Sequence, residues 1–190
     1  NTVENIKRVL DNGAYGIVVP MVNSRAEAEA VVDAARYAPI GKRSVGGFLH
    51  AVNFRTHPGS YYDRANDEIL VVVMVETAES LANLDEILSV KGIDAVFIGP
   101  NDLHNSFGLP PSFESDDPRF VAGLKRVLDC ARRHGVAPGI HVADAEMAKR
   151  RLADGFQFIA ITSEAGMLMS KAGEIVKSLG LGSGAATAKY

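Results

Sequence analysis

The sequence predicts an α/β fold built on a parallel β-sheet. Short apolar segments alternate with amphipathic helical segments along the 190 residues. Most of the apolar segments are continuous runs, such as Gly16-Ile17-Val18-Val19 and Leu70-Val71-Val72-Val73, rather than alternating ones. Continuous runs are typical of strands that are buried on both faces, and such strands occur mainly in parallel sheets covered by helices.

Five strands are expected from these runs. Their predicted bounds are Tyr15 to Pro20, Ile69 to Glu76, Ala95 to Gly99, Val136 to His141 and Phe156 to Thr162. A glycine lies between a helical segment and the next strand at Gly13, Gly92, Gly135 and Gly155. Glycine in that place is typical of a helix C-terminal cap, which supports these boundaries.

The helical segments carry their own start signals. Three capping residues are Ser24 (in a capping box with Glu27), Asp117 (before Pro118) and Asp144. The helices after Ser24 and Asp144 are expected to reach about Tyr37 and Ala153, and apolar positions between Val121 and Ala131 fall on one face of the helix after Asp117. Two more helices are expected, one from about Val3 to Asn12 and one around the apolar positions Leu81, Leu84, Ile87 and Leu88.

Two architectures compete for such a chain, a doubly wound open sheet and a (β/α)8 barrel. A doubly wound sheet usually has a glycine-rich phosphate turn, and the sequence contains no G-x-G-x-x-G. A barrel needs eight strands in roughly 250 residues. The sequence has no initiator methionine. On the barrel interpretation, about three strands would therefore precede Asn1.

Composition excludes several classes of function. The net charge of −3 gives no basic surface for nucleic acid, and no apolar run is long enough to span a membrane. The single cysteine, Cys130, excludes an internal disulfide and fits a reducing compartment, so a cytoplasmic protein is expected. Cys130 itself is predicted to be a packed, inert thiol.

The segment from Pro39 to about Asp67 is the one long connection. It is rich in Gly, Arg, His and Tyr. If it lies on the carboxyl side of a strand, it could form a wall of an active site. A surface or interface loop is an equally good interpretation.

Two predicted strands end in carboxylates. Glu76 ends the second strand, and Asp102 follows the third strand 26 residues later, which is about one βα unit. In a parallel barrel both side chains reach the same rim. Two adjacent carboxylates repel unless a cation lies between them, and oxygen ligands suit Mg²⁺ or Mn²⁺. Alternatively, Glu76 starts a helix and Asp102 forms a cap or an Asx-turn.

The run Gly99-Pro100-Asn101-Asp102 adds a second feature to this rim. Glycine lets a ligand approach the backbone closely. The backbone N–H groups of Asn101 and Asp102 are predicted to face an anion, such as the carboxylate of a substrate.

These residues resemble the HpcH/HpaI family of class II pyruvate aldolases. The matching stretches are Leu10 to Ala14, Val18 to Val22, Ala35 to Pro39, Val75 to Thr77, Gly92 to Leu103, Gly139-Ile140, Ala143-Asp144 and Phe158 to Thr162. The resemblance covers nearly the whole chain, and the stretch from Phe97 to Leu103 is the most specific.

The resemblance implies a TIM barrel, of which residues 1–190 would be a single domain holding strands 4 to 8. It implies a divalent metal, Mg²⁺, Mn²⁺ or Co²⁺, on Glu76 and Asp102, with pyruvate or oxaloacetate chelating it. It also implies substrate binding by the N–H groups of Asn101 and Asp102. Asp11 would support a catalytic histidine, although a plain polar residue at a helix end is the alternative. A hexamer built from swapped dimers is expected.

The sequence departs from the family pattern in several places. The catalytic histidine and a substrate-binding arginine would both precede Asn1. Met74 stands where many members have glutamine, and His141 stands where an apolar or small residue is expected. His141 either lines the site or makes a local hydrogen bond. Four loop residues could contact the far end of a substrate, although an interface or surface role is favoured: Arg43, Arg55, Tyr61 and Tyr62.

The function predicted on this basis is a metal-dependent lyase that makes or cleaves a carbon–carbon bond through a pyruvate enolate. The alternatives are a macrophomate-synthase-like decarboxylase that forms carbon–carbon bonds, and a citrate-lyase-β-like enzyme acting on acyl-CoA. A non-catalytic scaffold subunit is the alternative from a different class. Five strands cannot close a barrel, so a scaffold of this length would expose a sheet edge and aggregate.

Overall fold

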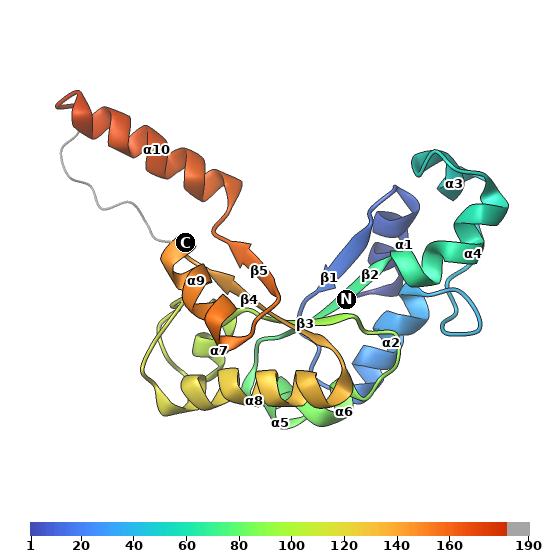
Figure 1. The fold of residues 1–190 in the computed structure, drawn as a ribbon, viewed down its shortest axis with the longest axis horizontal. Helices are drawn as coiled ribbons and strands as arrows, with labels where there is room; N and C mark the ends of the chain where they lie inside the picture. Colours follow the sequence, from blue (N-terminus) through green and yellow to red (C-terminus); the bar gives the residue numbers. More distant parts are fainter. Residues whose placement is uncertain (182–190) are drawn as a thin grey trace.

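The computed structural model describes residues 1–181 and contains a five-stranded parallel sheet (Figure 1). The strands are β1 (Gly16–Val19), β2 (Leu70–Val75), β3 (Ala95–Ile98), β4 (Ala137–Val142) and β5 (Phe158–Ile161). The helices are α1 (Val3–Asp11), α2 (Arg25–Ala35), α3 (Leu49–Asn53), α4 (Pro58–Glu68), α5 (Ala78–Ala82), α6 (Leu84–Leu88), α7 (Pro100–Ser106), α8 (Pro118–His134), α9 (Ala145–Asp154) and α10 (Glu164–Ser178).

The order of the strands decides between the two architectures. The strands lie side by side in chain order, β1-β2-β3-β4-β5, and every pair is parallel. A doubly wound sheet reverses its strand order at a switch point, whereas a barrel adds each strand to the same edge. The sheet is therefore a curled half-barrel, and the α/β prediction is confirmed. The assignment of its strands as 4 to 8 of a closed barrel stays a prediction, and residues 182–190 of the predicted domain lie outside the described residues.

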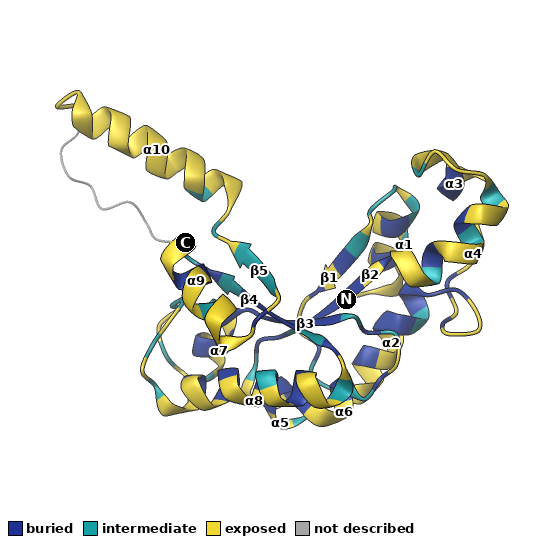
Figure 2. Ribbon diagram, viewed as in Figure 1, coloured by how far each residue is buried: buried dark blue, intermediate teal, exposed yellow. Residues whose placement is uncertain are grey.

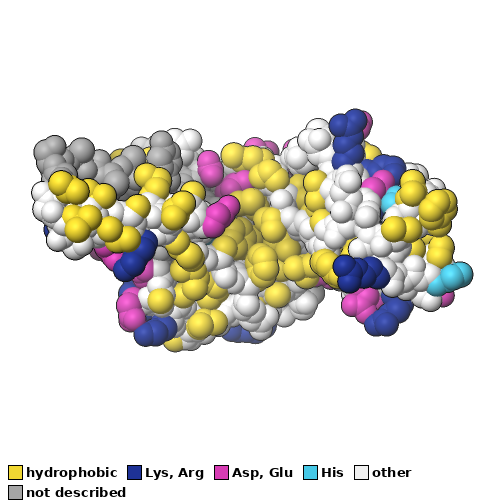
Figure 3. Space-filling view, turned by 90° about the horizontal axis from the view of Figure 1, so that it is seen from above, with side chains coloured by type: hydrophobic (Ala, Val, Ile, Leu, Met, Phe, Trp, Pro, Cys, Tyr) yellow, Lys and Arg dark blue, Asp and Glu magenta, His cyan; other side chains and the backbone are white. Residues whose placement is uncertain are grey.

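The two faces of the sheet are packed differently. Side chains that point outward join the main core beneath the helices, where Val71, Val73 and Val75 of β2 are fully buried. Side chains that point into the concave face form a smaller apolar cluster around Val72 and Phe97. Seen from above, hydrophobic side chains gather in the hollow of this face (Figure 3). The alternation along each strand therefore decides which residues can face a ligand in the hollow.

Local sequence signals explain where the helices begin and end. Ser24 and Glu27 form both hydrogen bonds of the predicted capping box, and Asp117 and Asp144 accept hydrogen bonds from the first turns of α8 and α9. The predicted helix around residues 81–88 is divided at Asn83 into α5 and α6. The four glycines that precede strands all have positive φ, which fits their expected role at helix ends.

Of the two interpretations of residues 39–67, the structure speaks against the active-site wall and leaves a surface or interface role open. The segment contains helices α3 and α4 rather than a long loop. It also follows a helix and precedes β2, so it lies at the amino ends of the strands, where a barrel does not place its site. The side-chain amide of Asn53 donates to the carbonyl oxygen of Asp11 at 2.7 Å, which ties α3 to the end of α1. Figure 1 shows α3 and α4 beyond that end of the sheet.

The last helix, α10, makes little contact with the rest of the chain. It has no buried residue, and it extends away from the sheet (Figure 2). Its exposed apolar side chains include Leu168, Ile175 and Leu179. None of the described helices has the length and apolar character needed to cross a membrane.

Candidate active site

Glu76 is held at the carboxyl end of β2. It follows Val72 and Met74 at alternate positions, so it continues the row of side chains that face the hollow. Only 2% of its surface is exposed. The backbone N–H of Met21, a residue with a positive φ of 53°, donates to Oε1 of Glu76 at 2.8 Å. This bond joins the end of β1 to the carboxylate and fixes its orientation.

The charge on Glu76 is only partly compensated. Burial raises the pKa of its carboxyl group, the N–H of Met21 lowers it, and the negative charge of Asp102 raises it again. The net result is a pKa above the ordinary value. The negative charge of Asp102 therefore acts on Glu76, which fits two carboxylates at the same ends of neighbouring strands.

Gly99 makes room for the Glu76 carboxylate. Val75 pairs with Ile98 in the sheet, so Gly99 lies beside Glu76 at the end of the neighbouring strand. A Cβ atom on Gly99 would lie 2.3 Å from Oε2 of Glu76. The carboxylate thus occupies the space in which any other residue would place its side chain. This explains physically why the strand ends in glycine here.

Helix α7 presents two backbone donors at the same rim. Gly99 is its N-cap and Pro100 its first residue, so Asn101 and Asp102 lie in the first turn. The first helical bond runs from the N–H of Leu103 to the oxygen of Gly99, at 3.0 Å. No side chain caps this helix start. The N–H groups of Asn101 and Asp102 therefore have no partner among the described residues and can meet an anion.

The carboxylate oxygen atoms of Glu76 and Asp102 are suitable ligands for a hard divalent cation. Two carboxylates meet at one rim, one of them buried with a raised pKa and a single backbone donor. A cation between them would relieve both the desolvation of Glu76 and its repulsion from Asp102. Carboxylate oxygen completed by water is the ligand set that Mg²⁺ and Mn²⁺ prefer. The residues present therefore suit the ion that the sequence predicted.

His141 lies at the same level on the next strand. Ile140 pairs with Ile98, so His141 is beside Gly99, with Glu76 on the other side. The separation from Glu76 is about 10 Å, since neighbouring strands are roughly 4.8 Å apart. Nε2 of His141 donates to the carbonyl oxygen of Thr162 at 3.0 Å, which confirms the local hydrogen bond. Nδ1 has no partner among the described residues, so the ring also offers a free nitrogen.

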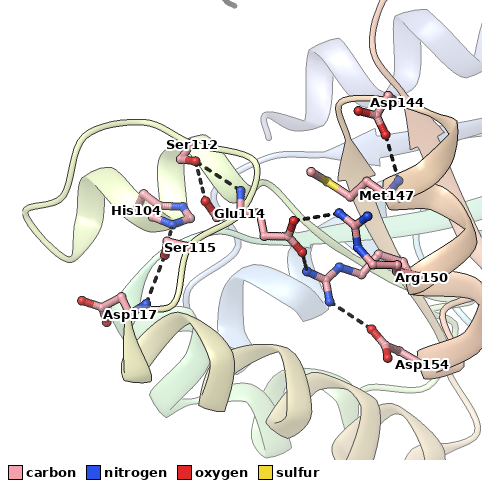
Figure 4. A network of polar contacts seen from close by, with 10 residues as sticks. His104, Ser112, Glu114, Ser115, Asp117, Asp144, Met147, Arg150 and Asp154 are labelled. Atoms are coloured by element: carbon pink, nitrogen blue, oxygen red, sulfur yellow. Dashed lines mark hydrogen bonds and ion pairs between the residues drawn. The ribbon is translucent and has the colours of Figure 1, made fainter.

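Sequence reasoning missed residues 107–117, a segment whose Phe113 ring lies 5.0 Å from the ring of His141 at the rim. Nδ1 of His104, in α7, donates to the carbonyl oxygen of Pro100 at 2.7 Å. Its Nε2 accepts from the Ser115 hydroxyl, also at 2.7 Å (Figure 4). The Glu114 carboxylate accepts from Arg150 at 2.9 Å and from Arg151 at 2.6 Å, which anchors the segment to α9. Its position in the sequence, after β3 and the short helix α7, could have indicated that the segment lies near the carboxyl ends of the strands.

Asp11 lies at the other end of the sheet. It ends α1 before β1 begins, whereas Glu76 follows the last residue of β2. The six residues of β2 separate the two levels by about 20 Å. Asp11 contacts Arg43 at 2.8 Å and His50 at 3.0 Å, and it also pairs with Lys7. Burial raises its pKa, but the hydrogen bonds from Lys7 and Arg43 outweigh this effect and lower it.

The other residues of the 39–67 segment share this location. Arg43 and Tyr61 are buried, and Arg43 stacks over the ring of Tyr37 at 4.7 Å. The Tyr62 hydroxyl lies 3.1 Å from Nδ1 of His50. The structure therefore groups these side chains with Asp11 and does not bring them to the rim that holds Glu76.

The family model described as "HpcH/HpaI aldolase/citrate lyase" matches residues 1–171. The chain belongs to the HpcH/HpaI aldolase/citrate lyase family. The resemblance inferred from the sequence is confirmed, and the chain is a member of a family of carbon–carbon lyases.

Individual relatives agree with the family. The chain is 38% identical over 176 residues to a hydroxypyruvate/pyruvate aldolase of Rhizorhabdus wittichii, covering 93% of this chain and 69% of the relative. It is 36% identical over 189 residues to a 4-hydroxy-2-oxo-heptane-1,7-dioate aldolase of Shigella flexneri, covering all of this chain and 70% of the relative. The crystal structure of an HpcH/HpaI aldolase from Desulfitobacterium hafniense matches with a TM-score of 0.86 and 29% identity, covering 97% and 71%.

Proposed function

We propose that this chain is a metal-dependent lyase that makes or cleaves a carbon–carbon bond next to the carbonyl group of a 2-oxo acid, through a pyruvate enolate. The observation that carries the proposal is the pair Glu76 and Asp102 at one rim, where Gly99 leaves room for the Glu76 carboxylate. The hydroxypyruvate/pyruvate aldolase among the relatives supports a pyruvate-type substrate.

The residues at this rim would have different roles in catalysis. Glu76 and Asp102 would hold Mg²⁺, Mn²⁺ or Co²⁺, which supplies Lewis-acid stabilisation for the negative charge that develops on the 2-oxo oxygen. The N–H groups of Asn101 and Asp102 would bind the substrate carboxylate and orient it. The apolar hollow around Phe97 would exclude water from the reacting carbon.

Asp11 is also proposed to support a catalytic histidine, but only across a contact between two copies of the chain. Within one copy it lies about 20 Å from the level of Glu76, so it cannot share a site with it. The exposed apolar side chains of α10 offer a surface for such an assembly. We therefore propose a homo-oligomer, and the hexamer expected from the family resemblance would supply such a contact.

The test measures metal binding and activity separately. Mn²⁺ binding to the wild-type chain is measured by calorimetry, and oxaloacetate decarboxylation and aldol cleavage are followed with Mg²⁺ or Mn²⁺ before and after EDTA. Glu76→Gln and Asp102→Asn are expected to weaken Mn²⁺ binding by at least about tenfold. Asp67→Asn is the matched control, because Asp67 is exposed and lies in α4 before β2, at the opposite end of the strand from Glu76.

Two results would overturn the proposal. Mn²⁺ that binds Glu76→Gln and Asp102→Asn as tightly as the wild type would remove these residues as ligands. Turnover that persists in both variants, or in EDTA, would remove the metal from the chemistry.

A further inference from the structure

A second group of metal-ligating side chains lies on the outer face of the sheet, between α6 and α8. Asp85 comes from α6, and Cys130 and His134 lie four residues apart on one face of α8. Oδ1 of Asp85 is 3.5 Å from the sulfur of Cys130 and 3.1 Å from Nε2 of His134. All three ligand atoms lie within 4.8 Å of one another. The site is formed by different helices from those of the proposed active site.

The spacing of these atoms fits tetrahedral coordination. Zinc bonds of roughly 2.3 Å to sulfur, 2.0 Å to nitrogen and 2.1 Å to oxygen place neighbouring ligands roughly 3.6 Å (S to O) and 3.4 Å (N to O) apart. The observed 3.5 Å and 3.1 Å are close to these values. Only small side-chain movements would therefore be needed to admit an ion.

We infer that Asp85, Cys130 and His134 form a binding site for a thiophilic divalent cation, with Zn²⁺ as the best match. A thiolate, an imidazole and a carboxylate are a ligand set that zinc accepts, and the thiolate disfavours Mg²⁺. On binding, the thiol proton of Cys130 leaves to solvent, and His134 coordinates through Nε2 with its proton on Nδ1. The inference does not depend on the proposed function, because it involves none of the same residues.

Arg133 currently takes the place of the cation. Its guanidinium donates to Oδ1 of Asp85 at 2.6 Å, the same oxygen that faces Cys130 and His134. The side chain of Arg133 is 60% exposed and can swing into solvent. Zinc binding therefore exchanges one cation for another on Asp85. This competition makes a specific prediction, since removing the guanidinium should tighten the binding of zinc.

The fourth coordination position would be open. A surface cavity of about 380 Å³ borders Asp85 and Cys130 and is lined on its other sides by Lys125, Arg126 and Asp129. Water would complete the tetrahedron from this side. Because the ligands come from two helices, the bound ion would clamp α6 to α8 and stabilise the fold.

The test uses Zn²⁺ in competition with a chromogenic chelator, with Mg²⁺ in large excess to occupy the oxygen-only rim. Cys130→Ser and His134→Gln are expected to weaken Zn²⁺ binding by at least about tenfold. Arg133→Gln is expected to tighten it by up to about tenfold, since the guanidinium that competes for Oδ1 of Asp85 is removed. Asp67→Asn serves as the control, because Asp67 is exposed and belongs to neither group of proposed metal ligands, and it should bind Zn²⁺ like the wild type.

Cobalt gives a second readout that does not depend on affinity. Co²⁺ bound to the wild-type chain should show a thiolate-to-metal charge-transfer band, and Cys130→Ser should lack it. Melting temperatures without metal confirm that each variant is folded. The inference is overturned if the wild type does not bind Zn²⁺, if Cys130→Ser and His134→Gln bind it undiminished, or if Asp102→Asn abolishes the binding instead.

Discussion

Gly99→Ala tests the geometry of the rim with the smallest possible change. The backbone of Gly99 has φ −91° and ψ 95°, which any L-residue can adopt, so the substitution introduces no backbone strain. The added methyl group would lie 2.3 Å from Oε2 of Glu76, 3.1 Å from Cε of Met74 and 3.2 Å from Cβ of Glu76. The flexible thioether of Met74 can yield, but the carboxylate is fixed by Met21.

The expected magnitude follows from these distances. An ordinary contact begins at 3.4 Å, so the Glu76 carboxylate must move by about 1 Å. A displacement of that size in a site that positions reacting groups costs on the order of 10²-fold in rate. We therefore expect kcat/KM for oxaloacetate decarboxylation or aldol cleavage to fall by about 10²-fold, together with weaker Mn²⁺ binding. Overpacking would also lower the free energy of unfolding by about 1–3 kcal/mol.

A matched control separates the local effect from a general one. Gly173→Ala adds the same methyl group on α10, where nothing lies within 4 Å, and should leave both activity and Mn²⁺ binding unchanged. A double-mutant cycle with Glu76→Asp, which withdraws the carboxylate by one methylene, should show strong non-additivity. Full activity of Gly99→Ala, or strict additivity in the cycle, would refute the proposed role of this glycine.

Three further predictions concern single side chains. His141→Leu removes a free ring nitrogen at the rim and should raise KM for hydroxyl-bearing substrates by about fivefold, with pyruvate as the unaffected comparison. Arg36→Ala should lower the free energy of unfolding, measured in urea, by roughly 3 kcal/mol. The reason is that buried Arg36 pairs with Asp94 and donates to three backbone carbonyl groups. An unchanged midpoint of the urea unfolding curve would contradict this. The pKa of Glu76 is raised in the folded chain, so the folded chain binds this proton more tightly than the unfolded chain does. In EDTA, the free energy of unfolding should therefore fall as the pH rises from about 4.5 through the raised pKa. Asp102→Asn should make this fall smaller, and an unchanged pH dependence would count against the coupling.

The sheet could be predicted from the sequence because each strand is a local apolar run. Every predicted strand is present, within three residues of its expected bounds. The placement of Glu76 and Asp102 at one rim also followed from the sequence, because neighbouring strands of a parallel sheet end at the same edge. The capping residues were equally visible, since a cap depends only on residues a few positions away.

Long-range contacts could not be predicted in the same way. The bond from Met21 to Glu76 spans 55 residues and depends on a positive φ that Met does not favour. The location of residues 39–67 could not be predicted, because the amino-acid composition of a segment does not determine at which end of the sheet it lies. Residues 107–117 were overlooked because Ser115 and Glu114 acquire a role only once His104 and α9 are beside them.

Glu76 and Asp11, at opposite ends of the sheet, show how environment separates a carboxylate suited to bind a cation from one whose charge is already compensated. Asp11 already has Lys7, Arg43 and His50 around it, its pKa is lowered, and its charge is neutralised without an ion. Glu76 has one backbone donor and a negative neighbour, so the fold leaves its charge uncompensated. A buried carboxylate in that state either takes up a proton or binds a cation. Near neutral pH, with Asp102 at the same rim, a divalent ion would be the more effective partner, because one ion would compensate both charges.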